Sequence, residues 1–227
     1  MARRCNLLLV DNTDTKRDAY FTPMLHAVLA KHANVRLVRD SETLRRTMAD
    51  ADGIVTSGSQ HTLSENIPED VLTMNAIALR SSVPVLGVCF GMQVMALLHG
   101  GKLERLVDTC EGVHRIHVDP HSTLLGGEKM TFDTYHNHDD AVTVLPDGYD
   151  EIAWLQDPTH NAIVAFEHKR LLRFGVQFHP EYERRTASHV LVRFVHLCSS
   201  YRRAHQRVQD VQERYSECSR GCSECGR

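Results

Sequence analysis

The chain has 227 residues, a length that one hydrophobic core can serve together with a short appended segment. Hydrophobic residues make up 42% of it and charged residues 24%, which are ordinary globular values and exclude a disordered, collagen-like or coiled-coil protein. The formal net charge of -3 argues against a broad electrostatic contact with nucleic acid or with an anionic membrane. We therefore expect a folded protein whose partner is a small molecule or another protein.

No apolar run approaches the length of about 20 residues that a membrane helix needs. The apolar stretch 7–10, which follows the basic N-terminal residues, is also too short for a secretion signal. The seven cysteines are odd in number and scattered, unlike the cysteines of a secreted disulfide framework. We expect a cytoplasmic protein with reduced thiols and no membrane segment.

The first hundred residues alternate short β-rich runs with amphipathic helical patterns, which is typical of βαβ units and a parallel sheet. The predicted strands are 7–10, 35–38, 53–56 and 83–88. The predicted helices are 19–31, 41–48, 69–79 and 92–99, and Ser41 is the predicted N-cap of the second.

After residue 101 the pattern changes to short strands separated by turns. The predicted strands are 103–107, 113–118, 131–135, 141–144, 152–155, 163–166 and 172–178. A helix over 187–197 is expected to close the domain, which we place at residues 1–199. Residues 200–227 are rich in Arg, Glu, Gln and Ser and are predicted to form an appended helix and a charged, cysteine-containing tail.

Residues 84–93 read P-V-L-G-V-C-F-G-M-Q, a buried-strand pattern that runs into Gly-x-Cys-x-Gly and then into a helix. Small residues on both sides of Cys89 let the chain turn sharply between strand and helix. Such a turn places the thiol at the carboxyl edge of the sheet, where a helix N-terminus favours the thiolate. We predict that Cys89 is a nucleophile; the alternative is a buried structural cysteine with glycines for close packing.

Residues 174–181 read F-G-V-Q-F-H-P-E and supply the groups that a cysteine nucleophile needs. The nucleophile requires a base, and the base requires an acceptor on its second ring nitrogen. His179 and Glu181 are two residues apart, so that they point to the same side of an extended chain. The alternative for this motif by itself is a strand end with a solvated charge.

Together with Y-H-N-H-D-D-A-V at 135–142, these two motifs resemble class I glutamine amidotransferases, and their wording is close to the amidotransferase domain of GMP synthase. The resemblance implies an α/β fold of the amidotransferase, flavodoxin-like type: a mostly parallel sheet with helices on both faces and an added antiparallel part. It also implies that Cys89 is the nucleophile, His179 the base and Glu181 the residue that orients the base.

The resemblance further implies a glutamine pocket and a pair of backbone oxyanion donors. One donor is the N–H of Phe90, and the other maps onto Gly58 and Ser59, in a loop that reads T-S-G-S-Q where the family usually has S-G-G-P. The residues implied to contact the substrate or to form the wall of its pocket are Gln93, His136, Asn137 and His138.

The implied activity is hydrolysis of L-glutamine through a Cys γ-glutamyl thioester, with release of ammonia and without a metal or an organic cofactor. The sequence contains no phosphate-binding loop, so we expect the ammonia to pass to a separate synthetase subunit or to be released. One alternative is a γ-glutamyl peptidase or hydrolase that acts on γ-glutamyl amides or peptides, because the S-G-S form of the loop resembles such relatives. Another is a regulatory protein that kept the fold.

Two groups of residues could in principle bind a metal ion, but we predict that neither group does so. His114, His117 and His121 alternate along a predicted strand, but no cysteine or carboxylate pattern completes a site, so we predict a surface strand. Cys218, Cys222 and Cys225 offer three soft ligands where structural zinc uses four. We predict a redox-sensitive tail, with a zinc or intermolecular site as the alternative.

Overall fold

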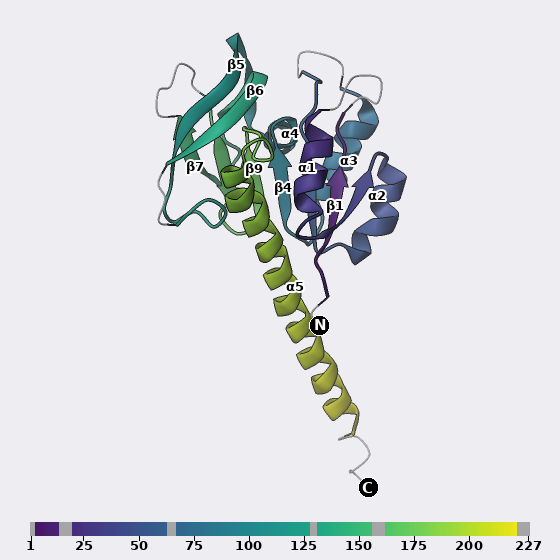
Figure 1. Ribbon diagram of the computed structural model, residues 1–227. Coiled ribbons are helices and arrows are strands. Elements are labelled where there is room, and N and C mark those ends of the chain that lie inside the picture. Colours follow the sequence, from purple (N-terminus) through teal and green to yellow (C-terminus); the bar gives the residue numbers. More distant parts are fainter. Residues whose placement is uncertain (1–2, 14–19, 63–66, 128–130, 156–161, 222–227) are drawn as a thin grey trace.

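The computed structural model describes residues 3–13, 20–62, 67–127, 131–155 and 162–221. In these residues a nine-stranded sheet has the order β2-β1-β3-β4-β9-β8-β7-β5-β6 (Figure 1). The first five strands of this order pair in parallel. They are β2 (Asn34–Val38), β1 (Asn6–Val10), β3 (Gly53–Thr56), β4 (Val85–Val88) and β9 (Arg173–Val176).

The other strands extend the sheet with antiparallel pairs. They are β8 (Ala165–His168), β7 (Tyr149–Leu155), β5 (Lys102–Val118) and β6 (Thr131–Val144). The predicted α/β class, with its parallel core and its added antiparallel part, is therefore confirmed.

Helices cover both faces of the parallel half, because alternate side chains of each buried strand point to opposite sides. Leu7 and Leu9 of β1 share a core cluster with α1 (Phe21–Leu29) and α5 (Arg184–Gly221). Leu8 and Val10 belong to the cluster of the other face, which contains three helices and a short 3-10 turn. These elements are α2 (Ser41–Thr47), the turn η1 (Met48–Asp50), α3 (Glu69–Leu79) and α4 (Phe90–Leu98).

The N-cap of α2 lies one residue earlier than predicted. Asp40 is extended, and its carboxylate accepts the N–H of Thr43 at 2.7 Å, whereas Ser41 is the first residue of the helix. This hydrogen bond from Thr43 lowers the pKa of Asp40. Asp and Ser are both good N-caps, and the sequence pattern alone did not separate two neighbouring candidates.

Strands β5 and β6 form a long two-stranded ribbon where the sequence predicted two short strands on each side. Their pairing continues from Lys102 opposite Val144 to His117 opposite Thr131, with register shifts after Lys102 and Arg105. The polar run 136–140, which resembles a loop in composition, is therefore paired strand. Cross-strand pairing has overridden the low β-propensity of these residues.

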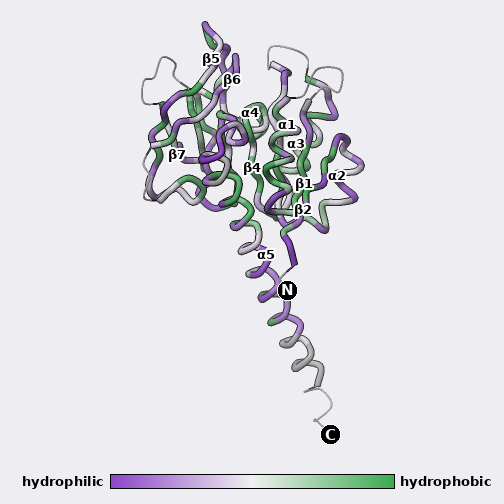
Figure 2. The backbone as a smooth tube through the Cα atoms, viewed as in Figure 1, coloured by the Kyte–Doolittle hydropathy of each residue, from purple (hydrophilic) through white to green (hydrophobic). Residues whose placement is uncertain are grey.

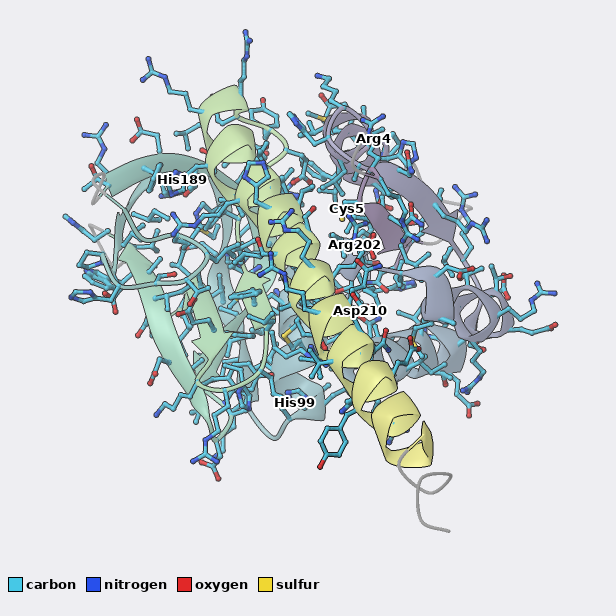
Figure 3. The ribbon with its side chains drawn as sticks, turned by 90° about the horizontal axis from the view of Figure 1, so that it is seen from below. Arg4, Cys5, His99, His189, Arg202 and Asp210 are labelled. Carbon is cyan, nitrogen blue, oxygen red and sulfur yellow. The ribbon has the colours of Figure 1, made fainter. Side chains whose placement is uncertain are left out.

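Helix α5 is a single helix of 38 residues, where the sequence predicted a helix over 187–197 and a separate one beyond it. Beyond the body of the protein the helix continues outward, and the coloured turns that leave the body are mostly hydrophilic (Figure 2). Arg202 holds α5 to the body, because it donates to Asp52 at 2.8 Å, close to the start of β1 (Figure 3).

The domain boundary at residue 199 stays a prediction, and Cys222 and Cys225 lie outside the described residues. No helix in the described residues is long and apolar enough to cross a membrane.

A buried arginine lies at the end of the parallel sheet opposite to Cys89. Arg173, at the start of β9, is 4% exposed and donates to the carbonyl oxygens of Leu79, Ser81 and Val83. Burial lowers the pKa of its guanidinium. The fan of hydrogen bonds fixes the connection between α3 and β4, and therefore the start of the strand that leads to Cys89.

We expect Arg173→Met to lower the free energy of unfolding by about 3 kcal/mol, because it leaves several buried carbonyl groups without a donor. Urea unfolding followed by circular dichroism measures this loss. The matched control is Arg170→Met, which removes an exposed arginine of the neighbouring turn and should change stability by less than about 0.5 kcal/mol. Equal effects of the two substitutions would contradict a structural role for the fan of hydrogen bonds.

Candidate active site

Cys89 lies in the sharp turn between β4 and α4, at the carboxyl end of β4. Its φ of 51° makes it the only non-glycine residue with positive φ among those that the structure describes. The backbone is held in this conformation by the N–H of Cys89, which donates to the carbonyl of Val176 on β9 at 2.8 Å. Phe90 is the first residue of α4, so its N–H has no acceptor within the helix. Strain of this kind costs about 1–3 kcal/mol and is typical of functional turns.

The two glycines of the turn are there because no side chain fits. A Cβ on Gly87 would lie 2.7 Å from backbone atoms of Gly91. A Cβ on Gly91 would collide with the carbonyl oxygen and the hydroxyl of Thr56, on β3. The turn therefore packs backbone against backbone, as the Gly-x-Cys-x-Gly pattern predicted.

His179 and Glu181 form a buried pair beside Cys89. The Nδ1 of His179 lies 2.9 Å from the Oε1 of Glu181, and the imidazole also hydrogen bonds to the Cys89 side chain. The N–H of His179 donates to the carbonyl of Tyr135 on β6 at 2.8 Å, which fixes this segment beyond the end of β9. The structure thus brings together the three side chains predicted to act as nucleophile, base and orienting group.

The environment of His179 favours its protonated form. Burial would lower the pKa of this imidazole, but the charge of Cys89 and the hydrogen bonds to Cys89 and Glu181 outweigh burial and raise the pKa to about 10. The Oε2 of Glu181 is buried without a hydrogen-bond partner in the described residues. The positive charge of the His179 imidazolium therefore balances the negative charge of the buried Glu181 carboxylate. The ring of Phe21 stacks on His179 at 3.8 Å between centroids, which also suits a cation.

The loop after β3 lies against the side chains of Cys89 and His179. A Cβ on Gly58 would lie 3.1 Å from His179 Cε1 and 3.6 Å from the Cβ of Cys89. The hydroxyl of Ser59 donates to the carbonyl of Asn12 at 2.8 Å. Ser59, which stands where the family usually has glycine, therefore fixes the loop to the segment after β1. Gly58 and Ser59 therefore lie beside Cys89 and His179, and their role as the second oxyanion donor stays a prediction.

A buried polar network that the sequence interpretation missed supports this loop. Asn12 donates through Nδ2 to the carbonyl of Ser57 at 2.8 Å and through its N–H to the Ser57 hydroxyl at 3.0 Å. Asn75 of α3 donates to the Oδ1 of Asn12 at 2.8 Å. The available signal was the position of Asn12 and Ser57, which lie two residues and one residue beyond the ends of β1 and β3.

Gln177 is a second residue that the sequence interpretation missed. Its amide Nε2 lies 3.7 Å from the Sγ of Cys89 as a donor, and its Oε1 accepts from Gln93 Nε2 at 3.2 Å. Gln93 also donates to the carbonyl of Asp140 at 2.7 Å. The side chain of Gln93 therefore links α4, β6 and the segment after β9 at the floor of the site.

A cavity of about 280 Å³ opens over Cys89. Among the predicted site residues, its lining includes Cys89, His179, Gly58, Ser59, Phe90, Gln93, Asn137 and His138. Glu181 lies behind His179, and the carbonyl of Asn137 lies 3.9 Å from the Sγ of Cys89. His136 is fully buried on the inner face of the β5–β6 ribbon and is not among the residues that line the cavity.

The two histidines of the β6 segment are neutral near pH 7. Burial lowers the pKa of His136 to about 2 and that of His138 to about 4. The ring nitrogens that face each other, Nδ1 of His136 and Nε2 of His138, are 3.3 Å apart. Neither imidazole therefore competes with His179 as the cation of the site.

Comparison with known proteins gives a consistent result. The family model described as Glutamine amidotransferase class-I matches residues 9–197. A glutamine-hydrolyzing GMP synthase subunit of Methanococcus maripaludis is 31% identical over 148 residues, which are 64% of this chain and 74% of that protein. The GMP synthase of Gloeothece citriformis is 32% identical over 74% of this chain, which spans only 30% of that longer enzyme.

Solved structures show the same fold. A protein from Thermoplasma acidophilum, assigned as the corresponding GMP synthase subunit, superposes with a TM-score of 0.77 at 25% identity, over 91% of this chain and 100% of that one. A glutamine amido transferase from Methylobacillus flagellatus has a TM-score of 0.59 at 19% identity, over 81% of this chain and 73% of that one, and supports the fold alone.

Proposed function

The chain belongs to the class I glutamine amidotransferase family, and from this premise we propose that it hydrolyses L-glutamine through a thioester on Cys89. The observation that carries the proposal is the buried arrangement of Cys89, His179 and Glu181 at the base of the cavity. A thiolate held beside an imidazolium is a ready nucleophile, and the proton for the leaving group is already in place.

The proposed reaction uses each group in turn. The Cys89 thiolate attacks the carboxamide carbon, and the N–H groups of Phe90 and of the Gly58-Ser59 loop receive the oxyanion. His179 then gives its proton to the departing ammonia, and the C–N bond breaks. In the second half, His179 takes a proton from water, which attacks the thioester and releases glutamate and the thiolate.

The size of the cavity supports an amino acid as the substrate. At about 280 Å³ it lies just below the range of roughly 300–1,000 Å³ that is usual for ligand pockets. Glutamine and a γ-glutamyl dipeptide present the same γ-carbonyl group, but the dipeptide needs more room on the leaving-group side. The γ-glutamyl peptidase alternative therefore requires a wider site than the one formed by the described residues.

The comparisons also support a separate acceptor for the ammonia. The M. maripaludis relative is one subunit of a GMP synthase, and this chain matches less than a third of the single-chain GMP synthase of G. citriformis. We propose that the chain supplies ammonia to a distinct synthetase subunit. Its cytoplasmic location and its independence of cofactors remain predictions.

The test compares substrates on the purified chain. Ammonia release from glutamine and glutamate release from γ-glutamyl dipeptides are measured with and without the synthetase subunit of a GMP synthase. Glutaminase activity, alone or on addition of the synthetase, is the expected result. Preference for dipeptides would replace the proposal by the peptidase alternative, and no turnover of either substrate class would contradict both.

Glu181→Gln should change the pH dependence as well as the rate. The charge and the hydrogen bond of Glu181 help to raise the pKa of His179, so their loss lowers this pKa. Because the protonated imidazole is the acid, the alkaline limb of the kcat/KM profile should move to lower pH. We also expect a rate about 10²–10³-fold below that of the unchanged chain, because the orientation of His179 is disturbed.

The matched control is Glu183→Gln, which neutralises a nearby carboxylate outside the site. Its pH profile should superimpose on that of the unchanged chain. A reduced rate for Glu181→Gln with an unmoved alkaline limb would show that Glu181 has a purely steric role.

A further inference from the structure

A cluster of sulfur and imidazole groups lies on the inner face of the β5–β6 ribbon. Cys110 pairs directly across from His138, and Gly112 pairs across from His136. Side chains two residues apart on a strand share a face, so these positions and His114 point the same way. Cys110, His136 and His138 are buried, with exposures of 5%, 0% and 7%.

The separation of the two imidazole nitrogens is that of two ligands on one tetrahedral metal ion, and the sulfur lies close by. One ligand atom from each of Cys110, His136 and His138 lies within 4.8 Å of the others, and His114 lies at the edge of this three-residue cluster, so Cys110 and His114 have to move inward to ligate. The Nδ1 of His136 and the Nε2 of His138 are 3.3 Å apart, and Cys110 Sγ is 3.8 Å from the Nε2 of His114. Zinc–nitrogen and zinc–sulfur bonds of about 2.0 and 2.3 Å at tetrahedral angles require ligand separations of about 3.3–3.6 Å.

The hydrogen bonds on the far side of both rings are those of a metal site. The Nδ1 of His138 faces the carbonyl of Asp140 at 3.0 Å and must donate to it, so its Nε2 carries a free lone pair. The hydroxyl of Thr134 lies 3.2 Å from the carbonyl of His114 and 3.0 Å from the Nε2 of His136. When this hydroxyl donates to the carbonyl, it accepts the Nε2–H of His136, and the Nδ1 lone pair of His136 is free as well. Outer hydrogen bonds of this type orient histidine ligands.

We propose that Cys110, His136 and His138 bind one divalent ion of the zinc class, and that His114 supplies the fourth ligand. A thiolate with imidazole ligands favours zinc over magnesium or calcium, which prefer oxygen. As the ion binds, the Cys110 thiol releases its proton to solvent, and His114 Nε2 exchanges its contact with the carbonyl of Glu111 for the metal.

The site is coupled to the cavity by the chain itself. Asn137 lies between two of the ligands, and its carbonyl is 3.9 Å from the Sγ of Cys89. His138 is at once a ligand and part of the cavity lining. A bound ion would therefore fix the wall beside the nucleophile, although the metal site itself does not depend on the proposed glutaminase activity.

The experiment measures metal binding on the full chain after removal of competing thiols. Cys89→Ala, Cys218→Ser, Cys222→Ser and Cys225→Ser are combined, and Zn²⁺ per chain is determined after equilibration and desalting. We expect one ion per chain. With Co²⁺ as the probe, a sulfur-to-metal charge-transfer absorption is expected, which reports thiolate ligation without further substitution.

Variants then assign the ligands. Cys110→Ser should abolish the charge-transfer absorption, and His114→Ala should weaken binding by about 10–100-fold; circular dichroism verifies that each variant is folded. His117→Ala removes a histidine of the same strand that stacks on Trp154, and it should bind as the parent does. The absence of a bound ion or of the cobalt absorption in the parent, or unchanged binding by folded Cys110→Ser, would overturn the proposal. Unchanged affinity in His114→Ala would overturn the assignment of the fourth ligand.

Discussion

Cys89→Ala should reduce ammonia release from glutamine by about 10⁴-fold or more while the protein stays folded. No other group in the described site can form the thioester, and loss of a nucleophile commonly removes most of the catalytic acceleration. The backbone at this position keeps its φ of 51° with either residue, so the strain is unchanged. Steady-state ammonia assays and thermal unfolding measure the two effects separately.

The control is Cys5→Ala, which removes a buried thiol from the opposite end of the parallel sheet, before β1 (Figure 3). Its turnover should match that of the unchanged chain. Undiminished turnover in Cys89→Ala would contradict the mechanism, whereas equal losses in both variants would indicate damage to the fold.

Gly91→Ala should lower the free energy of unfolding by about 3 kcal/mol, a large effect for the addition of one methyl group. The added Cβ would overlap the carbonyl oxygen of Thr56, which is backbone and cannot rotate away. Strand β3 and helix α4 must separate to admit it, and this displaces the turn that holds Cys89. Urea unfolding of the purified variant gives the loss.

Gly100→Ala is the control for Gly91→Ala, because it adds a methyl group where the backbone conformation is unfavourable but no atom is crowded. Gly100 has a φ of +92°, but a Cβ there would meet no atom within 4 Å. We expect a cost of about 1 kcal/mol from the unfavourable φ alone. If Gly91→Ala cost no more than this control, close packing between β3 and α4 would not explain the glycine.

The parallel half of the fold and the position of the nucleophile were predictable because their signals are local. Strands β1, β3 and β4 are short, mostly apolar runs, β2 alternates apolar and polar residues, and the Gly-x-Cys-x-Gly turn directly follows β4. His179 and Glu181 were paired with Cys89 from the groups that a cysteine nucleophile needs and from the family resemblance, whereas the parallel pairing of β4 with β9 that brings them together was not predicted. The resemblance then implied the same roles for these three residues and added the residues of the substrate pocket.

What the sequence did not reveal depends on contacts between distant segments. Asn12 reaches Asn75 across 63 positions, and Phe21 stacks on a histidine that lies far along the chain. The relation of Cys110 to His138 follows only from the register of two strands, and the polar run 136–140 concealed that one of those strands continues. The sequence interpretation had found no cysteine or carboxylate pattern that completes a site with His114, His117 and His121, although Cys110 lies on the same strand as His114 and His117.

Helix α5 is continuous, but its inner and outer parts differ in their local stability. Up to Arg202 its side chains pack on the sheet or pair with Asp52, whereas those described from Arg203 to Glu213 are exposed. Isolated helical segments of such length are marginal in water, so the outer turns open without unfolding of the body. Amide hydrogens of the inner turns should therefore exchange with solvent deuterium only through global unfolding, and protection should fall abruptly beyond Arg202.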